Sequence, residues 1–255
     1  MEERPVPADV PVVFQESWRM FASGWTQYLT VMLIIYIPAW VISALLAVSL
    51  GLPIRMGATY NFTPGTSFGS LLGPAAIVMI IGAVLSAIES AAIVSLFDMQ
   101  WHNQPLDWQE GIRRGLPFIW TIVATSVLVT LMTMVGFVLL IIPGVVVVFL
   151  MSLTVQAIVL DHMSVVAAIT ASSRAASRAF VPIVVIILTV LLAGLIVSFI
   201  FRGTGALADV ISTVFNIILS IWSSIAMGLA YLHGSRLAPA GGTAPQGPSG
   251  GSPVQ

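Results

Sequence analysis

Residues 118–160 form a stretch of 43 residues that carries no charge. As a single helix it would measure about 64 Å, roughly twice the hydrocarbon core of a bilayer. The stretch must therefore turn. Pro143 and Gly144 are the strongest helix-breaking pair within it, because proline lacks a backbone donor and glycine accepts unusual backbone angles. The pattern predicts a tight hairpin of two membrane-spanning helices, with the turn at this pair.

Composition places the whole chain in the membrane class. Of its 255 residues, 58% are hydrophobic and 7% are charged, whereas an ordinary soluble domain carries roughly 25% charged residues. A run of about 20 apolar residues crosses the bilayer core as a helix. This rule predicts six spans, at residues 29–50, 74–96, 118–141, 144–160, 181–201 and 210–232. The expected fold class is all-α, a polytopic bundle of six transmembrane helices.

The spans define the domain organisation and the orientation. Residues 1–236 are expected to form one domain, and residues 237–255, rich in glycine and proline, to form a disordered tail. The positive-inside rule assigns the arginine-rich side to the cytoplasm. With the N-terminus inside, seven of the nine basic residues lie on that side, so both termini are expected in the cytoplasm and the protein in the cell membrane. These seven are Arg4, Arg19, Arg113, Arg114, Arg174, Arg178 and Arg236.

Similar segments precede the first, third and fifth spans, so an interfacial helix followed by a hairpin is predicted three times. Residues 14–19 and 108–113 share the order aromatic, Gln, Glu, small, apolar, Arg, and residues 169–174 form a looser copy. Each is expected to be an amphipathic helix at the membrane interface. In the second, Asp107 and Glu110 have the spacing of a capping box. One helical face of the first carries Phe14, Trp18, Phe21, Trp25 and Tyr28, and in the third Thr170, Arg174 and Arg178 lie opposite Val166, Ile169 and Phe180.

Two roles are open for these three segments. They could seat the bundle in the headgroup region, with aromatic rings at the boundary and arginines reaching lipid phosphates. They could instead bind a specific lipid or a protein partner. In either case the candidate interfacial contacts are Trp18, Arg19, Arg113, Arg114, Arg174 and Arg178.

Glu89 is the carboxylate that falls inside a predicted span. A charge at that depth costs several kcal/mol, so the side chain is expected to face the bundle interior, either with a function or tying helices together. Small residues repeat every four positions around it, at Gly82, Ser86 and Ser90, and again in the last span. Such stripes favour close helix packing, with a polar path as the alternative. The candidate intramembrane polar site is Glu89, Asn216, Ser86 and Ser220.

The sequence contains no pattern typical of an enzyme. It has no cysteine, its three histidines have no metal-ligand spacing, and it lacks phosphate-binding and nucleophile motifs. We therefore expect no catalytic residues, no metal and no cofactor. A net charge of −1 leaves no basic surface for nucleic acid. The expected partners are membrane lipids and, where small-residue stripes meet between chains, a second copy or another membrane protein.

One region resembles a known family. Residues 136–144 read GFVLLIIPG, an apolar run then ends at Asp161, and a helix with serines and arginines follows. This order resembles the bacterial and archaeal membrane proteins related to the membrane domain found beside some glycerophosphoryl diester phosphodiesterases. The likeness is most specific over residues 136–180; residues 172–174, Ser-Ser-Arg, replace the family's Ser-Trp or Ser-Phe pair. It implies six membrane helices, while the phosphodiesterase activity belongs to a separate soluble barrel domain in fused members.

Two functions follow as expectations. The first is a non-enzymatic accessory or scaffolding protein, whose interfacial helices organise lipid or a partner at the cytoplasmic face. The second is a small permease or channel for a polar or lipid-like solute that uses Glu89, Asn216 and the threonines of the third span. An intramembrane enzyme would need a second acid, a histidine or a metal at membrane depth, and the sequence supplies none.

Overall fold

The computed structural model describes residues 9–49, 68–139, 141–201 and 206–236, and these residues form helices and turns without a strand. The expected tail, residues 237–255, lies outside them. The helices are α1 (Val10–Ser49), α2 (Phe68–Trp101), α3 (Trp108–Gly115), the short 3-10 helix η1 (Leu116–Phe118), α4 (Ile119–Leu139), α5 (Ile141–Met151), α6 (Thr154–Leu160), α7 (Val165–Arg178), α8 (Phe180–Ile200) and α9 (Ala206–Arg236).

The prediction of six spans in an all-helical chain is confirmed. Six segments are long and apolar enough to cross a membrane: Val10–Pro38, Ile80–Trp101, Trp108–Leu139, Ile142–Leu160, Phe180–Ile200 and Val210–Ser235. The protein is thus a multi-pass helical membrane protein. The first of these segments begins well before the predicted span, because the sequence preceding residue 29 continues into it as one helix, α1.

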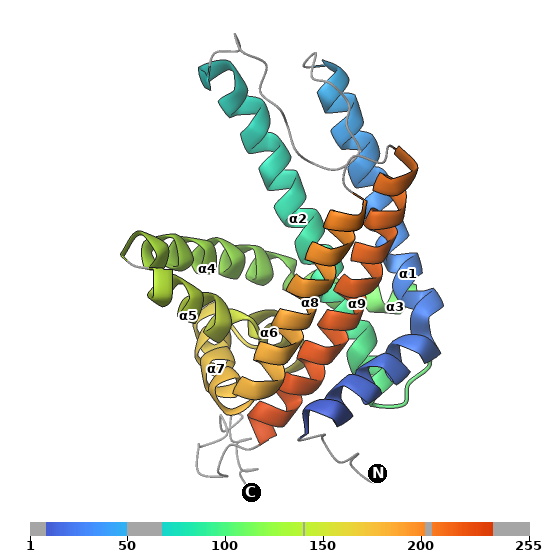
Figure 1. Ribbon diagram of the computed structural model, residues 1–255, viewed down its shortest axis with the longest axis vertical. Helices are drawn as coiled ribbons and strands as arrows, with labels where there is room; N and C mark the ends of the chain where they lie inside the picture. Colours follow the sequence, from blue (N-terminus) through green and yellow to red (C-terminus); the bar gives the residue numbers. More distant parts are fainter. Residues whose placement is uncertain (1–8, 50–67, 140, 202–205, 237–255) are drawn as a thin grey trace, which may run out of the picture.

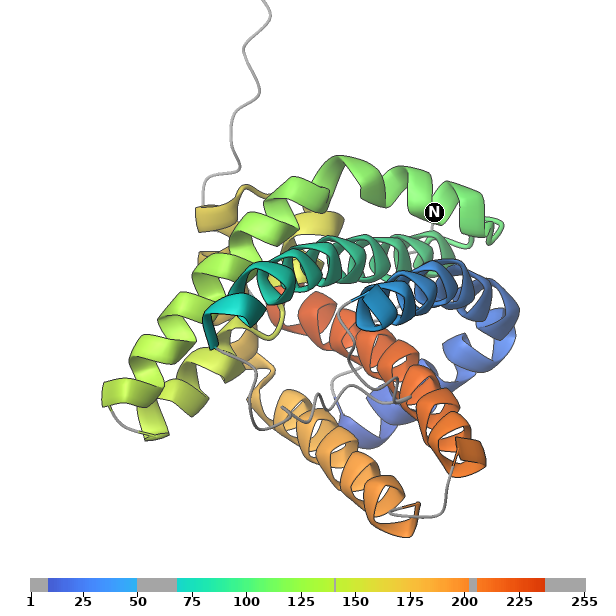
Figure 2. The ribbon, with the colours of Figure 1, turned by 90° about the horizontal axis from the view of Figure 1, so that it is seen from above.

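The helices form a bundle with one projecting arm. Helices α8 and α9 lie side by side, α1 and α2 pack against α9, and α4 runs across the direction of α8 and α9 (Figure 1). Seen from above, α4 and α5 extend away from the other helices as a pair (Figure 2). The start of α1 and the end of α9 lie at the same end of the bundle (Figure 1), as an even number of spans requires.

The aromatic face expected for the first part of α1 divides between buried and exposed residues. Phe21 and Tyr28 are buried, but Trp18 and Trp25 of the expected aromatic face are 56% and 51% exposed. Small residues decide which face packs, because they allow close approach. A Cβ atom on Gly24 would lie 2.7 Å from Leu106 Cδ1. The buried residues recur every three or four positions, at Val13, Ser17, Met20, Gly24, Tyr28, Val31 and Ile35.

The predicted hairpin forms, but its turn is displaced. Helices α4 and α5 pack together, and a Cβ atom on Gly136 would lie 2.9 Å from Gly144 Cα. Helix α5 already begins at Ile141, so the turn precedes Pro143 and Gly144. Proline is tolerated there because backbone N–H groups in the first turn of a helix have no intrahelical acceptor.

The fourth span is interrupted rather than continuous. Helix α5 ends at Met151 and α6 begins at Thr154, with Ser152 and Leu153 in a turn between them. The hydroxyl of Ser172, on α7, accepts a hydrogen bond from Leu153 N at 3.2 Å and donates one to Leu150 O at 2.7 Å. A completely buried side chain therefore satisfies backbone groups on both sides of the break.

Candidate functional site

Helix α7 presents two arginines away from the bundle. Arg174 and Arg178 are exposed, whereas Ser172 and the alanines at positions 168, 175, 176 and 179 are buried. The two arginines named for the polar face of this helix thus lie on the surface. On the other side Val166 is 72% exposed, and Phe180, the first residue of α8, is 54% exposed. The small alanines, rather than these larger residues, allow α7 to pack against its neighbours.

Helix α3 also carries two arginines, but both are held by one carboxylate. Asp107 caps the helix by accepting a hydrogen bond from Gln109 N at 3.1 Å. Glu110 does not complete the predicted capping box. It accepts hydrogen bonds from Arg113 Nε at 2.7 Å and Arg114 Nε at 2.8 Å. An ion pair with two arginines stabilises the carboxylate more than a backbone N–H does, so Glu110 turns towards the end of the helix.

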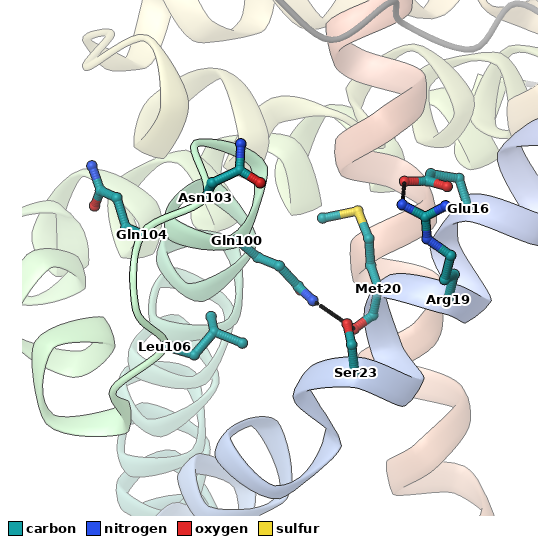
Figure 3. A pocket seen from close by; sticks show the side chains of 8 residues that line it. All are labelled: Glu16, Arg19, Met20, Ser23, Gln100, Asn103, Gln104 and Leu106. Carbon is teal, nitrogen blue, oxygen red and sulfur yellow. Dashed lines mark hydrogen bonds and ion pairs between the residues drawn. The ribbon is translucent and has the colours of Figure 1, made fainter. Parts of the chain in front are cut away.

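A polar pocket of about 340 Å³ lies between α1, the end of α2 and the following loop (Figure 3). Asn103 ends α2 in the left-handed conformation, with φ 55°, and Gln104 N donates to Met99 O at 2.8 Å, the bond that closes a Schellman motif. The lining residues are Glu16, Arg19, Met20, Ser23, Gln100, Asn103, Gln104 and Leu106.

The central side chain of this pocket is fully used in joining α1 to α2. Gln100 Nε2 donates to Met20 O at 2.7 Å and to Ser23 Oγ at 2.8 Å, as Figure 3 shows for these residues. Its Oε1 accepts from the buried Tyr28 hydroxyl at 2.8 Å. Gln100 has no donor left for a ligand, so we interpret the centre of the pocket as a contact that holds α1 against α2, the α1–α2 clasp. This clasp was not predicted, since Gln100 and Tyr28 are 72 positions apart.

Arg19, at the edge of the pocket, is paired with the acid of its own helix. Arg19 Nη2 lies 3.5 Å from Glu16 Oε1, and its side chain is 72% exposed. The pair leaves the rim of the pocket without net charge. The ring of Trp18, next to it, lies at a tilt against that of Phe21, with the centroids 5.5 Å apart. Trp18 is a predicted boundary residue, and it lies on the surface.

The candidate intramembrane site is not gathered into one cluster among the described residues. Glu89 is half-buried on α2, but Ser86 and Asn216 are exposed, and Asn216 Nδ2 donates to Ser212 O of its own helix at 2.7 Å. Ser220 is half-buried on α9. The lining of the polar pocket includes none of Glu89, Ser86, Asn216 and Ser220. The same holds for a second recess, which lies between α1, α8 and α9 and is described below.

The small-residue stripes divide between packed and open positions. In α9, Gly228 packs tightly: a Cβ atom there would lie 2.7 Å from Phe97 Cε1. In α2, Gly82 and Ser86 are exposed, and a Cβ atom on Gly82 would have no atom within 4 Å. Packing among the described residues therefore does not account for Gly82 and Ser86. In α4, Thr125 Oγ1 donates to Thr121 O, so these threonines bond to their own helix.

Sequence reasoning also missed a polar tie at the end of α6. The Tyr231 hydroxyl of α9 donates to Asp161 Oδ2, and the next residue, His162, adopts φ 53° with its ring 5.0 Å from Phe118. Asp161 was singled out only through the family resemblance. The signal in the sequence was a tyrosine within an apolar segment, because the hydroxyl of a tyrosine that becomes buried requires a hydrogen-bond partner.

Comparisons with known proteins identify no relative. No family model, no curated protein and no solved structure matches this chain. Within the residues that the structure describes, no three histidines, aspartates or glutamates are grouped so that they could hold a metal ion.

Proposed function

We propose that this protein is a non-enzymatic membrane component that organises anionic lipid at the end of the bundle where α7 lies. The proposal extends to the interfacial position of α3, α7 and the first part of α1, and to a cytoplasmic location of both chain ends. The resemblance to the membrane proteins found beside glycerophosphoryl diester phosphodiesterases supports membrane function without supplying a catalytic site.

One observation carries this proposal: the arginines of α7 differ in their pairing from Arg19, Arg113 and Arg114. Within the described ranges, Arg19, Arg113 and Arg114 each form an ion pair with a glutamate, whereas no carboxylate lies within 4 Å of Arg174 or Arg178. Both are exposed on a helix fixed by its buried alanine face. Arginine binds phosphate oxygens through two parallel hydrogen bonds, so two unpaired guanidinium groups on one face suit anionic headgroups.

Removing both arginines of α7 is expected to weaken the association with anionic lipid. A basic residue near an anionic membrane surface contributes about 1 kcal/mol, so R174A with R178A should lower the association constant of a lipid bound there by up to about 30-fold. The measurement is electron spin resonance of spin-labelled phosphatidylglycerol, compared with spin-labelled phosphatidylcholine, in reconstituted vesicles.

The matched control is R113A with R114A, which removes the same formal charge from arginines already held by Glu110. We expect this pair to lose less selectivity for phosphatidylglycerol than the α7 pair. Unchanged selectivity in the α7 variant, or an equal loss in both variants, would contradict lipid recognition by α7.

The alternative function, a small permease or channel, depends on Glu89. This carboxylate is half-buried within a helix apolar enough to span the membrane, and that placement is the observation in its favour. Among the described residues, Glu89 has no hydrogen bond or ion pair, and Asn216 and Ser86 face outward. The scaffold function therefore has more support from the contacts.

The substitution E89Q separates the two functions. Because no ion pair with a described residue depends on its charge, the variant should assemble as the wild type does and change the free energy of unfolding by less than about 1 kcal/mol. Proteoliposomes with a trapped pH-sensitive dye and an imposed potential then report proton flux. Equal flux in both proteins is expected. A flux carried by the wild type and lost in folded E89Q would establish the permease instead.

A further inference from the structure

A second recess, with apolar walls, lies between α1, α8 and α9. It has a volume of about 340 Å³. Its walls come from three elements that are far apart in the sequence, and all three belong to segments apolar enough to span a membrane. The lining residues are Phe14, Trp18, Thr189, Phe215, Ile218, Leu219 and Trp222. We call this recess the α1/α8/α9 groove.

The walls of the groove suit hydrocarbon. Phe14 and Trp222 meet with their ring centroids 5.0 Å apart, and Trp222 is only 5% exposed, so the floor is closed and aromatic. Trp18, which is 56% exposed, forms an outer wall. The hydroxyl of Thr189 donates to Val185 O at 2.8 Å, within its own helix. Its one donor hydrogen is therefore used within α8.

The groove opens onto the lateral surface of the bundle. Leu188 of α8 and Val214 of α9, each next to a lining residue in the sequence, are both 50% exposed. In a multi-pass membrane protein such apolar lateral surface faces lipid chains rather than water. Lipid hydrocarbon can therefore enter the groove from the surrounding bilayer.

The size of the groove favours a slender chain over a whole helix as its occupant. A helix with its side chains is about 10 Å across and rises 5.4 Å per turn, so a single turn has a volume of roughly 400 Å³. The groove holds about 340 Å³. A flexible chain one methylene wide can follow such a recess, whereas a helix of a second copy could place only a side chain in it.

We propose that the α1/α8/α9 groove is a binding site for one acyl chain of a membrane phospholipid. An apolar recess left empty would lose dispersion contacts along its whole lining, and an acyl chain restores them. The site is separate from the arginines of α7. It concerns the hydrocarbon part of a lipid and is independent of headgroup charge, so either proposal can fail without the other.

The test uses a photoreactive benzoylphenylalanine in place of Phe215, which lines the groove and is 38% exposed. The same residue in place of Leu195, which is 65% exposed and lies outside the lining, is the matched control. The full chain is purified in detergent without added lipid, irradiated and analysed by mass spectrometry. We expect a phospholipid adduct at position 215 and detergent adducts at position 195. Equal lipid adducts at both positions, or no lipid adduct at position 215, would overturn the proposal.

Filling the groove gives a second, independent test. T189W places an indole in the recess and should lower the lipid adduct at position 215 about tenfold, which corresponds to about 1.4 kcal/mol. Size-exclusion chromatography verifies that the variant is folded. An unchanged adduct in folded T189W would overturn the proposal, as would a crosslinked dimer at position 215, because a second copy would then occupy the groove. The first test uses no groove-filling substitution and remains decisive if T189W does not fold.

Discussion

Replacing Gly234 by valine is expected to separate α7 from α9 and to destabilise the folded protein by about 3 kcal/mol or more, at the upper end of overpacking effects. A Cβ atom at position 234 would lie 2.9 Å from Ala175 Cα and closer still to the Ala175 carbonyl oxygen. Both atoms belong to the backbone of α7. A flexible side chain could rotate out of the way, but a helix backbone can only move as a whole.

The same displacement should reach the arginines of α7. Ala175 is adjacent to Arg174 in the sequence, and Tyr231, one turn before Gly234, bonds to Asp161 at the end of α6. G234V should therefore shift α7 and strain the tie to α6 together. The free energy of unfolding can be measured by titrating the protein in mixed micelles with a denaturing detergent.

Gly194 provides the control for this substitution, since a Cβ atom there would have no atom within 4 Å. G194V places the same side chain in another apolar helix without a backbone clash and should change stability far less than G234V. Equal effects of the two variants would mean that loss of glycine, rather than the contact with Ala175, causes the destabilisation.

The number of membrane helices was predictable because it depends on length and hydrophobicity alone. Residues 118–160 must turn whatever their partners are. Single-residue placement was less predictable. Pro143 suits the first turn of a helix as well as a loop. The predicted fourth span begins at residue 144, whereas α5 begins three residues earlier, at Ile141. Packing at the start of α5, where Gly136 meets Gly144, is a contact that sequence spacing does not show.

The face that a membrane helix buries is harder to predict from sequence than the helix itself. Hydrophobic periodicity identifies the buried face of a helix in water, but in a membrane both faces are apolar. In α7 the packed face is therefore the alanine face, and Val166 and Phe180 are exposed. The serines at positions 172 and 173 have the same chemistry and differ only in direction. Size and backbone approach, rather than hydrophobicity, select the contact face.

Replacing Ser172 by valine is expected to destabilise the protein by about 1–3 kcal/mol, the cost of leaving a buried backbone donor unsatisfied. The substitution keeps a similar side-chain size and removes the hydroxyl that Leu153 N donates to. Leu153 is completely buried, and a donor within an apolar segment has no water to replace the lost bond.

The control for this prediction is S177V on the same helix. Ser177 is exposed, and its hydroxyl donates to Arg174 O within α7 at 2.9 Å. Its loss should change the free energy of unfolding by about 0.5 kcal/mol or less. Hydrogen exchange of the Leu153 amide gives the specific measurement: S172V should accelerate it, and S177V should not. If S172V leaves both stability and exchange unchanged, Ser172 does not support the break between α5 and α6, and the backbone there satisfies its own donors.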